Sequence, residues 1–193
     1  MRIVLASASP QRMALLSQLA LNVIWVPSRV DEEGGGTPEE RVLARARKKA
    51  LAVAAHQEGI VIGADTLIVL DKKVLGKPSS RAHAKRMLQQ LSGREHRVLT
   101  GLYVLITMSG NHEEACEETL VRFRNLEDEE IEAYLETGEY IDKAGSYAIQ
   151  GKAALFVEAI RGDFFNVVGL PLCRLALLLK ELGVGLLNPG CVP

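Results

Sequence analysis

The chain has 193 residues, of which 48% are hydrophobic and 24% charged, as is typical of a folded protein with a substantial core. Its formal net charge of −1 argues against a dedicated binder of nucleic acid or anionic membranes, because such proteins usually carry a basic excess. Three widely separated cysteines, with no apolar stretch long enough for a membrane span or signal peptide, predict a cytoplasmic protein with reduced thiols.

Strand-like and helix-like patterns alternate along the chain, which predicts an α/β protein. Apolar, β-branched runs predict strands at 3–6, 23–26, 60–64, 67–70, 98–107, 118–123, 154–160 and 166–168. Capping residues and apolar periodicity predict helices from Pro10, over about 38–55, after Ser80 to Gly93, over 128–137 and over 171–182. We expect one domain spanning 1–193, with a partly separate second lobe at about 95–160.

The first predicted helix begins with an unusual group of polar residues, in the segment ASASPQR. Ser9 is a suitable N-cap and Pro10 fits the first helical position. Arg12 then places a cation against the positive end of the helix dipole, a conflict that a bound anion near Ser7 would remove. The alternative is a solvated arginine on an ordinary capped helix.

Two further segments place charged residues beside glycine. In IVIGADTLIVL, Asp65 and Thr66 follow an apolar strand, where a carboxylate is often a metal ligand or a base, although a turn between two strands is equally consistent. In LGKP, Lys77 is presented from a turn that Gly76 and Pro78 shape, unless it is simply a surface lysine.

The remaining candidates lie in an acidic loop, a basic helix and a polar loop. Glu32 in VDEEGGG offers an oxygen ligand suited to Mg²⁺ or Mn²⁺, with a solvated acidic loop as the alternative. Lys49 follows Arg45 by four residues and shares its helix face. Polar residues among glycines in DKAGSYAIQGKA favour a binding loop; they include Asp142, Lys143 and Gln150. Together these groups would suit metal-assisted attack on a polyphosphate.

Eight short motifs in register resemble the Maf family of nucleotide pyrophosphatases, named for septum-formation inhibition, over about residues 3–182. They are SASPQR, DE, KKA, GADT, GKP, LSG, DKAGSYAIQG and NVVGLPL. The resemblance implies an elongated mixed, twisted sheet flanked by helices, with two lobes around a deep cleft. It also implies metal-dependent hydrolysis of a nucleoside triphosphate to the monophosphate and pyrophosphate, and a homodimer.

The resemblance also implies roles for individual residues. Asp65 matches the proposed catalytic proton acceptor, and Asp65 and Glu32 would hold the metal. The phosphate-contacting and basic positions match Ser7, Arg12, Lys49 and Lys77. The loop residues Asp142 and Lys143 are expected to bind substrate.

Three positions bear on the substrate base. The thymidine and uridine triphosphate branch of the family typically has Arg, Thr and Gln where this chain has Gln11, Thr66 and Gln150, so two of three match. A Gln amide can both donate to and accept from a uracil edge. The alternatives are a 7-methyl-GTP pyrophosphatase and a non-catalytic nucleotide sensor that regulates cell division.

Overall fold

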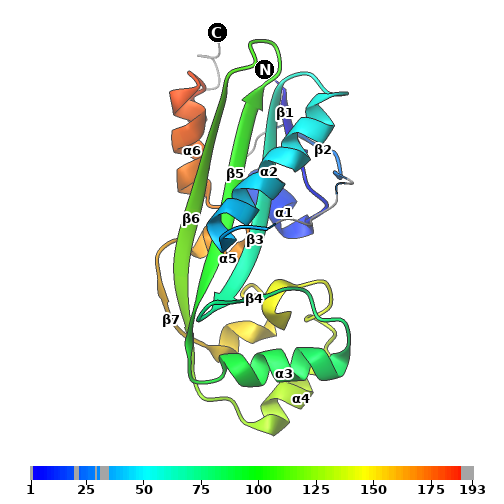
Figure 1. The fold of residues 1–193 in the computed structure, drawn as a ribbon, viewed down its shortest axis with the longest axis vertical. Coiled ribbons are helices and arrows are strands. Elements are labelled where there is room, and N and C mark those ends of the chain that lie inside the picture. The colour runs from blue at the N-terminus through cyan, green and yellow to red at the C-terminus, as the bar shows by residue number, and fades with distance from the viewer. Residues whose placement is uncertain (1, 20–21, 29, 31–34, 188–193) are drawn as a thin grey trace. The chain divides into compact units, whose positions relative to one another are not determined.

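A computed structural model describes residues 2–19, 22–28, 30 and 35–187, and it shows a mixed α/β fold (Figure 1). The strands are β1 (Ile3–Ala6), β2 (Val23–Trp25), β3 (Ile60–Leu70), β4 (Lys73–Leu75), β5 (Glu95–Ile106), β6 (His112–Phe123) and β7 (Val157–Arg161). The helices are α1 (Pro10–Gln18), α2 (Pro38–Ala54), α3 (Arg81–Leu91), α4 (Asp128–Glu136), α5 (Phe164–Val168) and α6 (Leu172–Glu181), with short 3₁₀ helices η1 (Ala144–Ser146) and η2 (Lys152–Phe156).

The seven strands form one mixed sheet in the order β2-β1-β3-β5-β6-β7, with β4 paired to β3. Strand β1 pairs in parallel with β2 and β3, whereas the β3–β4 and β6–β7 pairs are antiparallel. The predicted mixed sheet flanked by helices is therefore confirmed. In the part of the chain that the structure describes, no helix is both long and apolar enough to cross a membrane.

The chain divides into two compact units, each assembled from segments that are distant in sequence. Unit 1 comprises Met1–Asp65, Thr100–Glu117 and Gly169–Pro193, and unit 2 comprises Thr66–Leu99 and Glu118–Val168. Strands β3, β5 and β6 each contribute residues to both units. The single domain with a second lobe at about 95–160 stays a prediction.

Helix starts follow the sequence closely, because side chains cap the free N–H groups of the first turn. Ser9 accepts from the backbone N–H of Arg12 at 3.5 Å. At the start of α2, Thr37 and Glu40 form a reciprocal capping box. Ser80 caps α3 in the same way as Ser9 caps α1, so these predicted starts are confirmed.

Two features of the predicted strands are wrong. The runs 60–64 and 67–70 are both strand, but the predicted break between them is absent: they form the single strand β3, so Asp65 lies inside a strand. The run 166–168 belongs to helix α5, where the Asp163 carboxylate accepts from the backbone N–H of Phe165 at 2.7 Å. Asn166 is buried there and donates to the Val98 carbonyl, so tertiary contacts override its strand-like neighbours.

Smaller differences concern element ends. Strands β5 and β6 begin before the predicted residues, and the run predicted as one strand at 154–160 starts as the 3₁₀ helix η2 before β7. The short strand β4, at Lys73–Leu75, was not predicted, because three residues are too few for a period-two pattern.

In unit 1, two glycines allow helix α2 to lie directly against the sheet (Figure 1). A Cβ atom on Gly63 of β3 would lie 2.1 Å from the carbonyl oxygen of Ala46, and one on Gly101 of β5 would lie 2.4 Å from that of Val42. Such distances are shorter than any van der Waals contact, so only glycine permits this approach. The close packing brings Arg45 and Lys49 of α2 within reach of Asp65 on β3.

We therefore expect Gly63→Ala to lower the free energy of unfolding by about 2 kcal/mol, because the added methyl group must push α2 away from β3. Urea titration would measure the loss. The matched control is Gly76→Ala, since a Cβ at Gly76 meets no atom within 4 Å. Equal stability of the two variants would contradict the packing argument.

In unit 2, the core surrounds a buried histidine with aromatic rings. The ring of His96 packs edge to face against two aromatic rings. Its centroid lies 5.1 Å from that of Phe123 and 5.5 Å from that of Tyr147. Its Nε2 shares a 2.8 Å hydrogen bond with the Tyr147 hydroxyl, while the buried Nδ1 has no hydrogen-bond partner among the described residues. Burial lowers the pKa of His96 from 6.5 to about 4.

The low pKa of His96 predicts that the folded protein loses stability in mild acid. Because its pKa is lower in the folded than in the unfolded chain, the folded state binds fewer protons between pH 6.5 and 4. The contribution of His96 to the free energy of unfolding is fully present above pH 6.5. It falls toward pH 4 by on the order of 1 kcal/mol per pH unit. Urea titrations across this range should show a shallower pH slope for His96→Phe than for the wild type. Parallel slopes would show that another group governs the acid response.

Candidate active site

In unit 1, the carboxylate of Asp65 is buried and held by two cations from helix α2. Lys49 Nζ lies 2.5 Å from Asp65 Oδ1, and Arg45 Nη1 lies 3.4 Å from Oδ2. The two cations are one helical turn apart on the same face of α2, which the glycine contacts bring close to β3. A carboxylate at this depth is stable only because cations compensate the loss of water.

Arg12 is also buried, and its guanidinium joins the first and third segments of unit 1. Its Nε donates to the Gly169 carbonyl at 2.7 Å, and its Nη1 donates to the Ala64 carbonyl at 2.9 Å and to Ser7 Oγ at 3.0 Å. The structure therefore gives Arg12 acceptors within the protein itself. These acceptors supply a reason for its place near a helix N-terminus that does not depend on a bound anion.

Other polar groups at the start of α1 contact one another. Ser7 Oγ also accepts from the backbone N–H of Ser9 at 3.2 Å, and Ser9 Oγ donates to Gln11 Oε1 at 3.1 Å. The indole N–H of Trp25, the only tryptophan in the chain, donates to the Ser7 carbonyl. Trp25 is therefore a natural fluorescent reporter of this part of unit 1.

In unit 2, one backbone hydrogen bond joins the loops that carry Lys77 and Lys143. The N–H of Gly145 donates to the Gly76 carbonyl at 3.0 Å, directly beside the exposed Lys77. The loop around it is strained, because the non-glycine residues Asp142 and Ser146 have φ values of 60° and 66°. Backbone strain of this kind often accompanies a ligand-binding loop.

A carboxylate holds the following part of the same loop. Glu139 accepts from the backbone N–H of Lys152 at 2.7 Å, and a Cβ on Gly151 would lie 2.1 Å from Glu139 Oε2. The exposed Gln150 therefore lies within the turn that the hydrogen bond from the Gly151 N–H to the Ala148 carbonyl closes, directly before the part of the loop that Glu139 holds. The sequence did not mark Glu139, because nothing in its neighbourhood distinguishes it from a solvated carboxylate.

The predicted site residues fall into two groups by unit. Unit 1 brings Ser7 together with Arg12, and Lys49 together with Asp65. Gln11 lies beside Ser9 in the same unit. Unit 2 contains Thr66, Lys77, Asp142, Lys143 and Gln150. Glu32 lies outside the described residues.

Of the two predicted metal ligands, Asp65 and Glu32, only Asp65 lies among the described residues. Among residues 2–19, 22–28, 30 and 35–187, no group of three or more His, Cys, Asp or Glu side chains could hold a metal ion. Both Asp65 oxygens already face cations. The described residues by themselves therefore do not form a divalent-metal site.

The chemistry that unit 1 offers is electrostatic. One buried carboxylate faces two cations, an arrangement that can orient a water molecule and neutralise negative charge as it develops on a phosphoryl group. Arg45 was noted in the sequence for its spacing from Lys49 but was not predicted as a site residue. The four-residue spacing was the signal that could have identified it.

The chain is similar to known proteins over most of its length. A family model described as Maf-like protein matches residues 2–182. A dTTP/UTP pyrophosphatase from Thermococcus gammatolerans is 50% identical over 186 residues, covering 96% of this chain and 99% of that protein. Another from Pelotomaculum thermopropionicum is 48% identical over 188 residues, covering 96% and 98%. Among solved structures, the Staphylococcus aureus Ham1 protein matches 64% of this chain and 72% of its own, at 17% identity and a TM-score of 0.47.

Proposed function

Since the chain belongs to the Maf-like protein family, we propose that it is a nucleoside triphosphate pyrophosphatase that hydrolyses dTTP and UTP to the monophosphate and pyrophosphate. Relatives 45–50% identical over almost the whole chain carry the name dTTP/UTP pyrophosphatase. The structural observation that supports the proposal is the buried Asp65 carboxylate between Lys49 and Arg45.

We assign Asp65 the role of orienting the water molecule that attacks the α-phosphorus. Its two cations fix the carboxylate in one position, so the reacting groups lose little freedom during the reaction. Lys49 and the exposed Lys77 would neutralise charge on the phosphoryl oxygens. In this proposal Ser7 contacts phosphate, while Arg12 holds Ser7 in place through their 3.0 Å hydrogen bond.

The divalent ion belongs to the same proposal. Mg²⁺ or Mn²⁺ would screen phosphate charge, and the ligands assigned to it are Asp65 and Glu32. The assignment of a metal site therefore depends on Glu32. If the variant Glu32→Gln kept full activity at every metal concentration, this assignment would be wrong.

Base selection is assigned to unit 2. Gln150 and Thr66 are the two positions that match the pyrimidine branch of the family, and the Glu139 anchor supports the loop that carries Gln150. An amide on a fixed loop can read both a carbonyl and an N–H of uracil or thymine. Asp142 and Lys143, on the strained part of the same loop, are assigned to substrate binding.

The test is pyrophosphate release by the purified protein with Mg²⁺ or Mn²⁺, across dTTP, UTP, CTP, 5-methyl-UTP, GTP and 7-methyl-GTP. Highest turnover with dTTP or UTP would support the proposal. Highest turnover with 7-methyl-GTP would show that Gln11 outweighs Thr66 and Gln150. Binding without turnover would instead identify a nucleotide sensor. The homodimer and the cytoplasmic location stay predictions, and light scattering would test the first.

A further inference from the structure

Helix α2 carries a third cation on the face that approaches Asp65. Arg41, Arg45 and Lys49 are spaced by four residues, so they lie along one side of α2 over about 12 Å at 1.5 Å per residue. Two of the three compensate one carboxylate, Asp65.

Arg41 is the member of this set for which the described residues provide no ion-pair partner. It is half-buried, and its buried Nε has no hydrogen-bond partner among the described residues. The neighbouring Glu40 carboxylate instead accepts from the Thr37 backbone N–H at 2.8 Å. A buried donor without an acceptor is costly, and such atoms in folded proteins usually meet a ligand or water.

We propose that Arg41, with Arg45 beside it, binds phosphate oxygens of the nucleoside triphosphate; this rests on the proposed function. A guanidinium group donates in a planar fork that fits a phosphate. Arg12, by contrast, donates from Nε and Nη1 to acceptors within the protein, at Ser7, Ala64 and Gly169.

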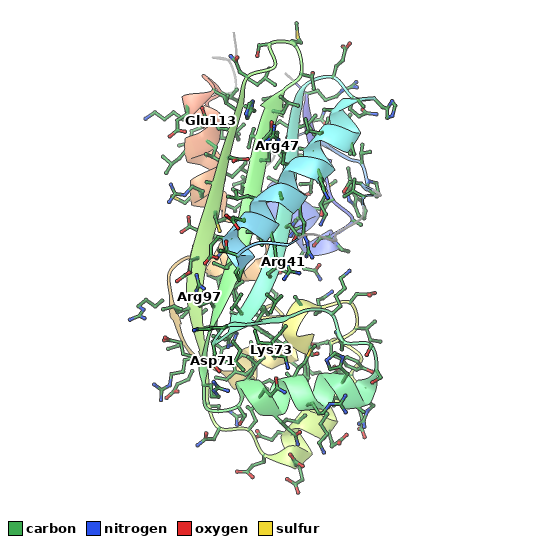
Figure 2. All side chains as sticks on the ribbon, viewed as in Figure 1. Arg41, Arg47, Asp71, Lys73, Arg97 and Glu113 are labelled. Atoms are coloured by element: carbon green, nitrogen blue, oxygen red, sulfur yellow. The ribbon has the colours of Figure 1, made fainter. Side chains whose placement is uncertain are left out.

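The chain contains a matched control on the same helix. Arg47 lies about 200° around α2 from the middle of the Arg41–Arg45–Lys49 face, at 100° per residue, and its guanidinium lies 5.8 Å from the centre of the Tyr103 ring. Figure 2 shows Arg41 near the start of α2 and Arg47 further along it. Arg47→Gln thus removes the same charge from the same helix on its other side.

The experiment compares wild type, Arg41→Gln, Arg41→Lys and Arg47→Gln. Binding of inorganic pyrophosphate is followed by Trp25 fluorescence and by calorimetry, and kcat and KM for dTTP are measured alongside the melting temperature. For Arg41→Gln we expect the Kd for pyrophosphate and the KM for dTTP to rise roughly tenfold to a hundredfold. Arg41→Lys should lose less, and Arg47→Gln should stay within about twofold of the wild type.

The outcomes separate this inference from the proposed function. Wild-type protein that binds pyrophosphate through Arg41 but releases none from any triphosphate would overturn the proposed function and keep the inference. Arg41→Gln that binds pyrophosphate and dTTP as Arg47→Gln does would overturn the inference and leave the proposed function standing. An equal loss of binding and of melting temperature in both Arg41 variants would also overturn it, in favour of a purely structural role.

Discussion

Asp65→Asn is expected to lower kcat for pyrophosphate release at least about a hundredfold. The amide has nearly the same shape as the carboxylate, but it carries no charge and is a far weaker acceptor for a proton. It also leaves Lys49 and Arg45 without the anion that they face. The measurement is steady-state release of pyrophosphate from dTTP by folded protein.

The control for this variant is Asp71→Asn. Asp71 directly follows the last residue of β3 and is exposed, and both its carboxylate oxygens accept from Arg94. Because exposed ion pairs contribute little to stability, this variant should match the wild type in both fold and turnover. Wild-type turnover by Asp65→Asn would remove Asp65 from the reaction altogether.

Arg12→Met is expected to destabilise the protein by about 3–5 kcal/mol in the absence of any nucleotide. The substitution keeps an apolar side chain of similar length but removes the donors that serve the carbonyls of Ala64 and Gly169. Each of these buried acceptors would then lack its partner. Urea titration followed by the fluorescence of Trp25, whose indole binds the Ser7 carbonyl, would report the loss where it arises.

The comparison for Arg12→Met is Arg86→Met, on the exposed side of α3. Surface substitutions of this kind usually change stability by less than about 0.5 kcal/mol. If Arg12 served only to bind phosphate, the two variants would be equally stable without ligand and would differ only when nucleotide is added. That result would return Arg12 to the role that the sequence motif implies.

The sequence predicted helix starts well because their causes are local. Ser9, Thr37 and Ser80 each cap a helix through hydrogen bonds within three residues, which a short window of sequence contains. The spacing of Arg45 and Lys49 is local in the same sense, and it correctly placed both on one face of α2.

The errors concern features that depend on distant residues. The sequence placed Asp65 after a strand, with a turn as an equal alternative, whereas it lies inside β3. The cations of α2 make that buried place favourable. Asn166 was read with its apolar neighbours as a strand, although its amide donates to the carbonyl of Val98, 68 residues away. The internal acceptors of Arg12 were equally invisible in the motif that contains it.

The bond between Arg12 and the Gly169 carbonyl joins residues 157 positions apart. A ribosome makes proteins from the N-terminus, so a nascent chain exposes Arg12 long before its acceptor exists. The third segment of unit 1 begins at this same glycine. Unit 1 therefore completes its packing only after its third segment has been synthesised, and its many long-range pairings should make folding slow. Until then, the arginine and the strands around it remain open to chaperones and to aggregation.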